Sequence, residues 1–356
     1  MTADVLLFVI GITALTVGAD SLVRGSSCLA ERLGVSQLVI GLTVVAFGTS
    51  APELFVSGAA SLAGKPDVAV GNVMGSTVAN VGLIVGIGAL LRPITVHRRL
   101  LVRETPLVMV VLTAVMLLSL NDSIGRPDGL LLMTCFTVYI LFLLKWGGGG
   151  LDKLAQEVEA RGGARVVSAD QGDEADKEAP AGQDPACRVD TAKNTFLSRL
   201  RGRHRMPWAV GEVAIGLPLL LVGSHWLIES ALHLAEAFHV PEAVIAVTMI
   251  AVGTSLPELA STVAAALRGM GDLAIGNVIG SNVFNLGLVL GTAALLRPLD
   301  LRPSIVVSQV LPALVFSAML IPLALSKERV GRFEGALLLT TYIGFIIWIL
   351  IPQHPL

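Results

Sequence analysis

Charged side chains are scarce in this sequence. Only 15% of the 356 residues are Asp, Glu, Lys or Arg, whereas a soluble protein carries about 25%. Hydrophobic residues make up 54% of the chain, and the mean hydropathy is +0.77. This shortage of charge excludes a water-soluble globular protein and predicts an integral membrane protein whose partner is the lipid bilayer. The net charge of −2 gives no electrostatic basis for a nucleic-acid partner.

Residue patterns typical of enzymes are also missing. The three cysteines are widely separated and match no metal-binding spacing. The sequence has no phosphate-binding loop, no cofactor motif and no nucleophile paired with a base. We therefore predict a protein that is not an enzyme and has no resident cofactor.

Long apolar segments, by contrast, fill both halves of the chain. A helix needs about 20 apolar residues to cross a bilayer. We expect transmembrane helices at approximately 4–32, 35–63, 68–91, 101–120, 127–146, 207–237, 241–267, 272–296, 303–325 and 331–352. The polar segment 147–206 between them is predicted to be a flexible linker. The predicted organisation is a five-helix repeat at 1–146, the linker, and a second five-helix repeat at 207–356.

The basic residues orient these predicted helices. With the N-terminus outside, the inner loops carry more Lys and Arg than the short outer loops, which is the bias of cytoplasmic loops. No basic residue precedes the apolar run Val5–Val17, so we expect an uncleaved first helix rather than a signal peptide. We predict a multi-pass protein of the cell inner (cytoplasmic) membrane with a cytoplasmic linker.

A segment of about fifty residues occurs twice, with an offset of 205 positions and no gap. The first copy holds Gly48–Leu54 (GTSAPEL) and Gly71–Asn80 (GNVMGSTVAN). The second holds Gly253–Leu259 (GTSLPEL) and Gly276–Asn285 (GNVIGSNVFN). Because each half has an odd number of predicted helices, the second copy crosses the membrane in the opposite direction. The predicted fold class is an all-α membrane protein made of two inverted five-helix repeats.

The first motif places oxygen atoms within an apolar helix. Pro52 has no N–H to donate, so it should interrupt its helix and release carbonyl groups. Thr49 and Glu53 are four residues apart and share a helix face, with Ser50 beside them. The second copy repeats this arrangement at Thr254, Ser255, Pro257 and Glu258.

The second motif adds a polar stripe on the following helix. Asn72, Ser76 and Asn80 are spaced by four residues, and their counterparts are Asn277, Ser281 and Asn285. We expect Asn72 and Asn277 to cap or bridge the broken helices rather than to bind an ion.

Hydroxyl, amide and carboxylate oxygens without His or Cys select Na⁺, Ca²⁺ or Mg²⁺. Ca²⁺ accepts about 6–8 oxygens in flexible geometry, which suits such a cage better than the strict octahedron of Mg²⁺. Two carboxylates at membrane depth are costly, and a single divalent cation neutralises both.

The duplicated motifs resemble those of the calcium/cation antiporter superfamily, specifically prokaryotic sodium/calcium exchangers. The resemblance covers both transmembrane halves. It implies ten transmembrane helices, with broken helices 2, 3, 7 and 8 around the site and a sliding pair formed by helices 1 and 6. It implies cation ligation by the side chains of Thr49, Ser50, Glu53, Ser76, Asn80, Thr254, Ser255, Glu258, Ser281 and Asn285, and by the carbonyls of Ala46 and Ala251.

Two positions depart from the relatives. Some relatives carry Asp where this chain has Asn285, and that Asp is linked to K⁺ in potassium-dependent exchangers, so Asn285 weakens the case for potassium dependence. Thr77 replaces the Asn that usually follows Gly-Ser, whereas Asn282 keeps it. We expect only a packing effect at Thr77.

The predicted function is secondary antiport, by a monomer, of Ca²⁺ against Na⁺ through alternating access. An alternative is H⁺ as the coupling ion, carried by Glu53 and Glu258. A passive cation channel fits less well, because two inverted half-sites meet at one point rather than line a pore. In the first predicted helix, Asp20, Arg24 and Glu31 are expected near the inner end rather than in the site. The acids and histidines of the sixth predicted helix are expected to face loops or headgroups rather than an ion pathway; they are Glu212, Glu229, Glu236, His225 and His233.

Overall fold

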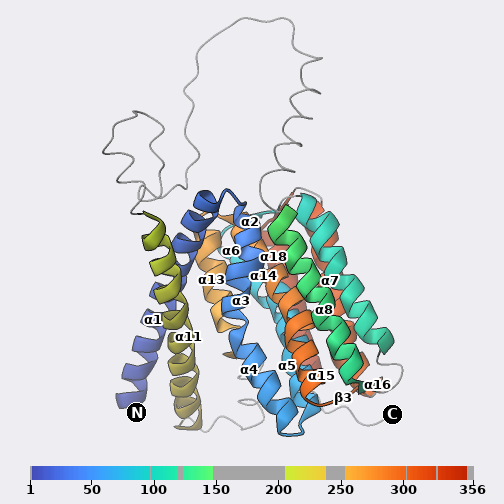
Figure 1. The fold of residues 1–356 in the computed structure, drawn as a ribbon. Coiled ribbons are helices and arrows are strands. Elements are labelled where there is room, and N and C mark those ends of the chain that lie inside the picture. The colour runs from blue at the N-terminus through green and yellow to red at the C-terminus, as the bar shows by residue number, and fades with distance from the viewer. Residues whose placement is uncertain are drawn as a thin grey trace, which may run out of the picture.

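A computed structural model describes residues 2–96, 98–118, 123–146, 205–237, 253–301, 303–325 and 328–350. Over these ranges the chain is a bundle of helices with four two-residue strands (Figure 1). The predicted linker 147–206 lies outside the described residues except for its last two, which belong to a helix. Ala251, one of the predicted ligands, also lies outside them.

The first half follows the predicted order of helices. Its elements are α1 (Thr2–Leu33), α2 (Gln37–Ile40), the π-helical turn η1 (Gly41–Val45), α3 (Ala46–Thr49), α4 (Ala51–Leu62), α5 (Pro66–Ala79), the π-helical turn η2 (Asn80–Val85), α6 (Gly86–Leu91), β1 (Ile94–Thr95), α7 (Arg98–Leu118), β2 (Ser123–Ile124) and α8 (Arg126–Trp146).

The second half has a similar order over its described residues, with a further π-helical turn before α17. Its elements are α11 (Arg205–Ala237), α13 (Leu256–Leu267), α14 (Gly271–Phe284), the π-helical turn η4 (Asn285–Val289), α15 (Leu290–Leu296), β3 (Leu299–Asp300), α16 (Pro303–Ile305), the π-helical turn η5 (Val306–Val310), α17 (Leu311–Leu325), β4 (Arg329–Val330) and α18 (Arg332–Leu350). Each antiparallel strand pair joins the two halves: β1 pairs with β4, and β2 pairs with β3.

Seven helices of the described ranges are long and apolar enough to cross a bilayer. They are Asp4–Leu33, Pro66–Leu91, Arg126–Lys145, Met206–Ala231, Gly271–Leu296, Pro303–Pro322 and Arg332–Ile349. The pair Gln37–Thr49 and Ala51–Leu62, bent by 46°, makes an eighth if it is one span. Shorter apolar helices cover Glu104–Leu118 and Leu256–Leu267. The prediction of an all-helical membrane protein is confirmed.

Two of the helices expected to be broken do have a break. The helical path stops at Ser50 (φ −83°, ψ 7°) before α4, and at Ser255 (φ −88°, ψ 4°) before α13. Each break lies two residues before a proline, Pro52 or Pro257, because proline is well suited to the first turn of a new helix.

The expected breaks in helices 3 and 8 are wrong. These helices run continuously over Pro66–Leu91 and Gly271–Leu296. Neither contains a proline after its first residue, so the backbone bonds of the helix are not forced open. The distortion takes the form of a π-helical turn that begins at Asn80 in one helix and at Asn285 in the other.

These two continuous helices form the centre of the bundle. In Pro66–Leu91 and Gly271–Leu296, 78% and 83% of the apolar window is buried, against 17–28% in α1, α8, α11 and α18. Large apolar side chains on peripheral helices point outward, including Phe55, Trp208 and Phe333. Such an apolar exterior around a polar interior is expected for a protein surrounded by lipid.

Helices α1 and α11 stand side by side at one edge of the bundle (Figure 1). Glycines let their backbones touch along this seam. A Cβ added at Gly18 would lie 2.5 Å from the backbone N of Leu220, and one at Gly216 would lie 2.7 Å from that of Leu22. Small residues at a helix seam give the close packing on which membrane helices depend for association.

Candidate cation-binding site

Two buried carboxylates occupy equivalent places in the two halves. Glu53 and Glu258 are each the third residue of a helix, α4 or α13, and both are 0% exposed. The preceding proline fixes the helix start. A helix N-terminus carries partial positive charge and unsatisfied N–H groups, so it favours a carboxylate in its first turn. The sequence Ser-Ala/Leu-Pro-Glu thus places a buried carboxylate in the first turn of a helix.

Each carboxylate accepts side-chain hydrogen bonds through one oxygen. Glu53 Oε1 accepts a bond from Ser76 Oγ at 3.3 Å. Glu258 Oε1 accepts bonds from Ser50 Oγ at 3.0 Å and from Ser281 Oγ at 3.5 Å. The bond from Ser50 crosses between the repeats, so one half of the chain helps to hold the acid of the other half.

Among the predicted side-chain ligands, four buried oxygens have no hydrogen-bond donor in the described part of the chain. They are Glu53 Oε2, Glu258 Oε2, Asn80 Oδ1 and Asn285 Oδ1. Buried polar atoms in proteins are nearly always paired, because an unpaired one costs about 1–3 kcal/mol and more when charged. These four acceptors are related in pairs by the sequence repeat. Such a set of oxygens can coordinate a cation.

Asn72 and Asn277 brace the helix breaks. Asn72 Nδ2 donates to the carbonyl of Glu53 at 3.2 Å, and Asn277 Nδ2 donates to that of Glu258 at 3.5 Å. Their Oδ1 atoms accept bonds from the opposite repeat, from Thr254 Oγ1 and Thr49 Oγ1 respectively, both at 3.3 Å. Both ends of each amide are therefore occupied. This geometry agrees with the expectation that these two residues bridge the helices.

The two predicted threonine ligands lie on these braces. Thr254 Oγ1 donates to Asn72 Oδ1, and Thr49 Oγ1 is within donating distance of both Asn277 Oδ1 and Ala46 O. The predicted carbonyl ligand Ala46 is fully buried, and its oxygen accepts bonds from Ser50 N at 2.9 Å and from Thr49 Oγ1 at 3.4 Å. The structure therefore brings the described predicted ligands into one polar region. The carbonyl oxygen of Ala46 already accepts two hydrogen bonds there.

Asn282 is a residue of this region that the sequence reasoning missed. Its Oδ1 accepts a hydrogen bond from Asn80 Nδ2 at 2.9 Å, which leaves Asn80 Oδ1 unpaired. The equivalent residue, Thr77, donates to Val73 O of its own helix at 2.8 Å. The amide of Asn285 donates instead to Ser76 Oγ at 3.1 Å. The exchange of Asn for Thr at position 77 thus accompanies a change in hydrogen bonding, beyond the packing effect we expected.

Hard-oxygen chemistry dominates the region. Within the described ranges, no three His, Cys, Asp or Glu side chains are grouped so that they alone could hold a metal ion. The donor set consists of two carboxylates together with hydroxyls and amides, which are ligands suited to Na⁺ and Ca²⁺ rather than to zinc or copper.

Comparisons with known proteins agree with this chemistry. The family model described as "Sodium/calcium exchanger protein" matches residues 4–145 and 208–351. The inner membrane protein YrbG of Escherichia coli is 33% identical over 96% of this chain and 94% of its own length. The sodium/calcium exchanger MaX1 of Methanosarcina acetivorans is 30% identical over 98% of each chain. A solved structure of the sodium-calcium exchanger NCX_Mj, soaked with 2.5 mM Na⁺ and 0.1 mM Ca²⁺, superposes with a TM-score of 0.74 at 28% identity over 99% of both chains.

Proposed function

Because the chain belongs to the sodium/calcium exchanger protein family, we propose that it is a secondary antiporter that exchanges Ca²⁺ for Na⁺ across the cytoplasmic membrane. The transported ions are its substrates. The observation that carries this proposal is the set of four buried, unpaired acceptor oxygens on Glu53, Glu258, Asn80 and Asn285. A divalent cation at these oxygens would satisfy all four and neutralise both carboxylates.

The proposed ligands come from both repeats. The two glutamates supply charge, and Asn80 and Asn285 supply neutral oxygens. The hydroxyls of the predicted serine and threonine ligands complete the cage, which we assign to Thr49, Ser50, Ser76, Thr254, Ser255 and Ser281. The carbonyls of Ala46 and Ala251 complete the proposed set.

The proposed architecture is ten transmembrane helices in two inverted five-helix repeats, at 1–146 and 207–356, joined by the linker 147–206. Two observations support it. With the offset of 205, the break before α4 recurs before α13, and the π-helical turn that begins at Asn80 recurs at Asn285. The two strand pairs each join opposite halves, as a two-fold relation between the repeats requires. We further propose a monomer whose N-terminus is outside and whose linker is cytoplasmic.

Exchange follows from the cost of an empty site. Two facing carboxylates without a counter-ion are unfavourable in a low-dielectric interior. We propose that the site therefore crosses between its two accessible states only when it is loaded with one Ca²⁺ or with Na⁺. This condition makes transport an exchange rather than a leak.

A second candidate uses H⁺ as the coupling ion. It is favoured by the presence of two fully buried carboxyl groups, Glu53 and Glu258, because protons bound to them could neutralise the site in place of a cation. The fold and the Ca²⁺ ligands would be the same. The two candidates differ only in what replaces Ca²⁺.

Reconstituted vesicles separate these candidates. Ca²⁺ flux is measured first under an imposed Na⁺ gradient at equal pH, then under a pH gradient without Na⁺. Flux that requires Na⁺ on the opposite side supports Na⁺/Ca²⁺ exchange. Flux driven by pH alone assigns H⁺ coupling, and flux that needs no counter-ion contradicts antiport.

A further inference from the structure

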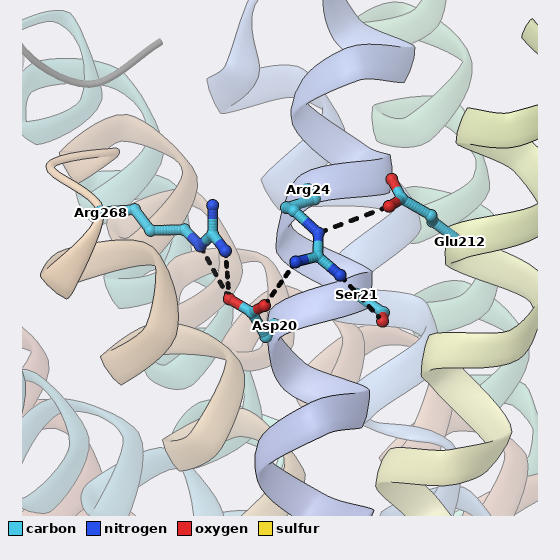
Figure 2. Close-up of polar contacts among 5 residues, drawn as sticks. All are labelled: Asp20, Ser21, Arg24, Glu212 and Arg268. Carbon is cyan, nitrogen blue, oxygen red and sulfur yellow. Dashed lines mark hydrogen bonds and ion pairs between the residues drawn. The ribbon is translucent and has the colours of Figure 1, made fainter. Parts of the chain in front are cut away.

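A cluster of four charged side chains lies away from the cation-binding region, between α1, α11 and the C-terminal end of α13. Figure 2 shows Arg268 reaching toward Asp20 of α1, with Arg24 and Glu212 beside it. Arg268 Nε donates to Asp20 Oδ1 at 2.8 Å, and its Nη2 contacts the same oxygen. Arg24 Nη1 donates to Asp20 Oδ2 at 2.8 Å, and Arg24 Nε lies 3.4 Å from Glu212 Oε1. Asp20 is thus held by two guanidinium groups, one on each oxygen.

Three of these residues belong to a two-helix unit. Asp20 and Arg24 are on α1, and Glu212 is on α11. The glycine seam brings the backbones of α1 and α11 into contact at several levels: a Cβ at Gly25, beside Arg24, would lie 2.8 Å from the carbonyl oxygen of Ala209. Because the two backbones already touch, sliding of one helix past the other is restricted. The α1–α11 unit is therefore expected to move as one body.

Arg268 belongs to the opposite side of the contact. It is the C-cap residue of α13, the helix whose first turn carries Glu258. Twelve residues of helix, Leu256–Leu267, separate the two ends, a length of about 18 Å at 1.5 Å per residue. The Asp20–Arg268 ion pair therefore ties the α1–α11 unit to the helix that carries one of the two buried acids.

The sequence repeat does not reproduce this tie at the other end of the unit. With the offset of 205, Arg268 corresponds to Ala63, Asp20 to His225 and Arg24 to Glu229. Ala63 has no charge to offer. His225 lies 3.8 Å from Glu229 on its own helix, so that pair does not join α11 to α4. Within the described ranges, the tie between the unit and a half-helix of the site is therefore present on one side only.

We propose that the Asp20–Arg268 ion pair is a one-sided latch, which holds the α1–α11 unit against α13 and opens when the unit moves relative to α13 during transport. This proposal rests on the proposed function. Because the other end lacks the ion pair, the latch favours one of the two accessible states over the other. The side chains are 26% and 36% exposed, so water weakens the interaction, and we expect a change of about fivefold in the ratio of the two states when it is removed.

Distance measurements test the latch independently of transport. Spin labels are placed at Val17 of α1 and Leu267 of α13, which are 49% and 52% exposed, in a variant whose native cysteines are replaced. In the unmodified protein, one label-to-label distance should predominate over a second. In Asp20→Asn and in Arg268→Gln, the ratio of the first population to the second should fall by about fivefold. The double variant should show the same fall as either single variant. The matched control is His225→Asn at the position equivalent to Asp20, which should leave the distribution unchanged. Identical distributions in all four variants would overturn the latch.

A reversible cross-link then tests whether the latch must open. Asp20→Cys and Arg268→Cys are joined in vesicles by a short bifunctional thiol reagent, and Na⁺-driven Ca²⁺ flux is compared before linking, after linking and after reduction. Loss of flux that reduction restores supports the latch, whereas full flux in the linked protein contradicts it. Absence of Na⁺-driven flux in the unmodified protein contradicts the proposed function instead, and the distance measurement still decides the latch.

Discussion

The two repeats share a motif, yet they hold their amide side chains differently. In the second repeat Asn282 accepts a hydrogen bond from Asn80 of the first. In the first repeat the equivalent Thr77 donates to Val73 O four residues earlier, a bond that threonine commonly makes inside helices. Both asparagines therefore donate across the site, but to different groups: Asn80 donates to the amide oxygen of Asn282, whereas Asn285 donates to the hydroxyl oxygen of Ser76.

The predicted serine ligands Ser76 and Ser281 also differ in their hydrogen bonds. Ser76 Oγ accepts bonds from Asn285 and from Ser255 while it donates to Glu53, so both of its lone pairs are occupied. Among the described residues, the hydroxyl of Ser281 makes one long hydrogen bond, 3.5 Å to Glu258 Oε1. Equivalent positions in a duplicated sequence are therefore unequal as cation ligands. Ser281 Oγ can therefore bind a cation as it stands, whereas Ser76 Oγ must first lose its hydrogen bond from Asn285 or from Ser255.

The largest expected effect on Ca²⁺ flux comes from replacing the buried acid of either repeat. Glu53→Gln and Glu258→Gln should each abolish Na⁺-driven Ca²⁺ flux, a loss of at least about 100-fold, because one buried charge of the shared site is lost. Both variants should still insert in the membrane, since Gln fills the same volume. Transport is measured in vesicles with equal amounts of protein. Near-normal flux in either variant would show that the acids are not ligands of one site.

A smaller effect is expected where the repeats differ. Asn282→Ala removes the acceptor that orients Asn80, so the Ca²⁺ concentration for half-maximal flux should rise by about tenfold, the cost of one buried hydrogen bond. Thr77→Ala removes only a bond within its own helix and should change that concentration by less than about twofold. Concentration dependence of flux is measured for both variants. Equal effects at the two positions would contradict the asymmetry described here.

The seam between α1 and α11 predicts a change in stability. In the first repeat, Gly18→Ala puts a Cβ 2.5 Å from the backbone of Leu220. We expect destabilisation by about 1–3 kcal/mol, as for other overpacked contacts. Gly211, where nothing lies within 4 Å of an added Cβ, is the matched control on α11. Thermal unfolding in detergent should separate the two variants, and equal midpoints would show that the seam is not tightly packed.

The smallest expected effect concerns the braces. Asn72 Nδ2 has one hydroxyl partner, Ser57, whereas Asn277 Nδ2 has two, Ser261 and Thr262, each at 3.0 Å. Ser57→Ala should therefore lower the free energy of unfolding by about 1 kcal/mol. Thr262→Val should cost less, because Ser261 remains. A larger loss in Thr262→Val than in Ser57→Ala would reverse this comparison.

Much of the fold could be predicted from the sequence, because long apolar segments and prolines act locally. The break before α4 follows from Pro52, and the offset of 205 locates its counterpart before α13. We expected a break in the third helix, but α5 continues into α6 through a π-helical turn that begins at Asn80. The sequence has no proline or other residue there that would distinguish a π-helical turn from a break. The pairing of Asn80 with Asn282 was also missed, because it depends on which amide faces which across the two repeats. Repetition identifies the residues of a site, but their partners depend on packing between the halves.

The central claim is that the two repeats build one shared cation site. Equilibrium binding of ⁴⁵Ca²⁺ to the purified protein in the absence of Na⁺ tests it most directly, with Glu53→Gln and Glu258→Gln measured alongside. We predict one high-affinity Ca²⁺ per chain and its loss in either variant. Two Ca²⁺ per chain, with one retained in each variant, would contradict a shared site and assign a separate site to each repeat.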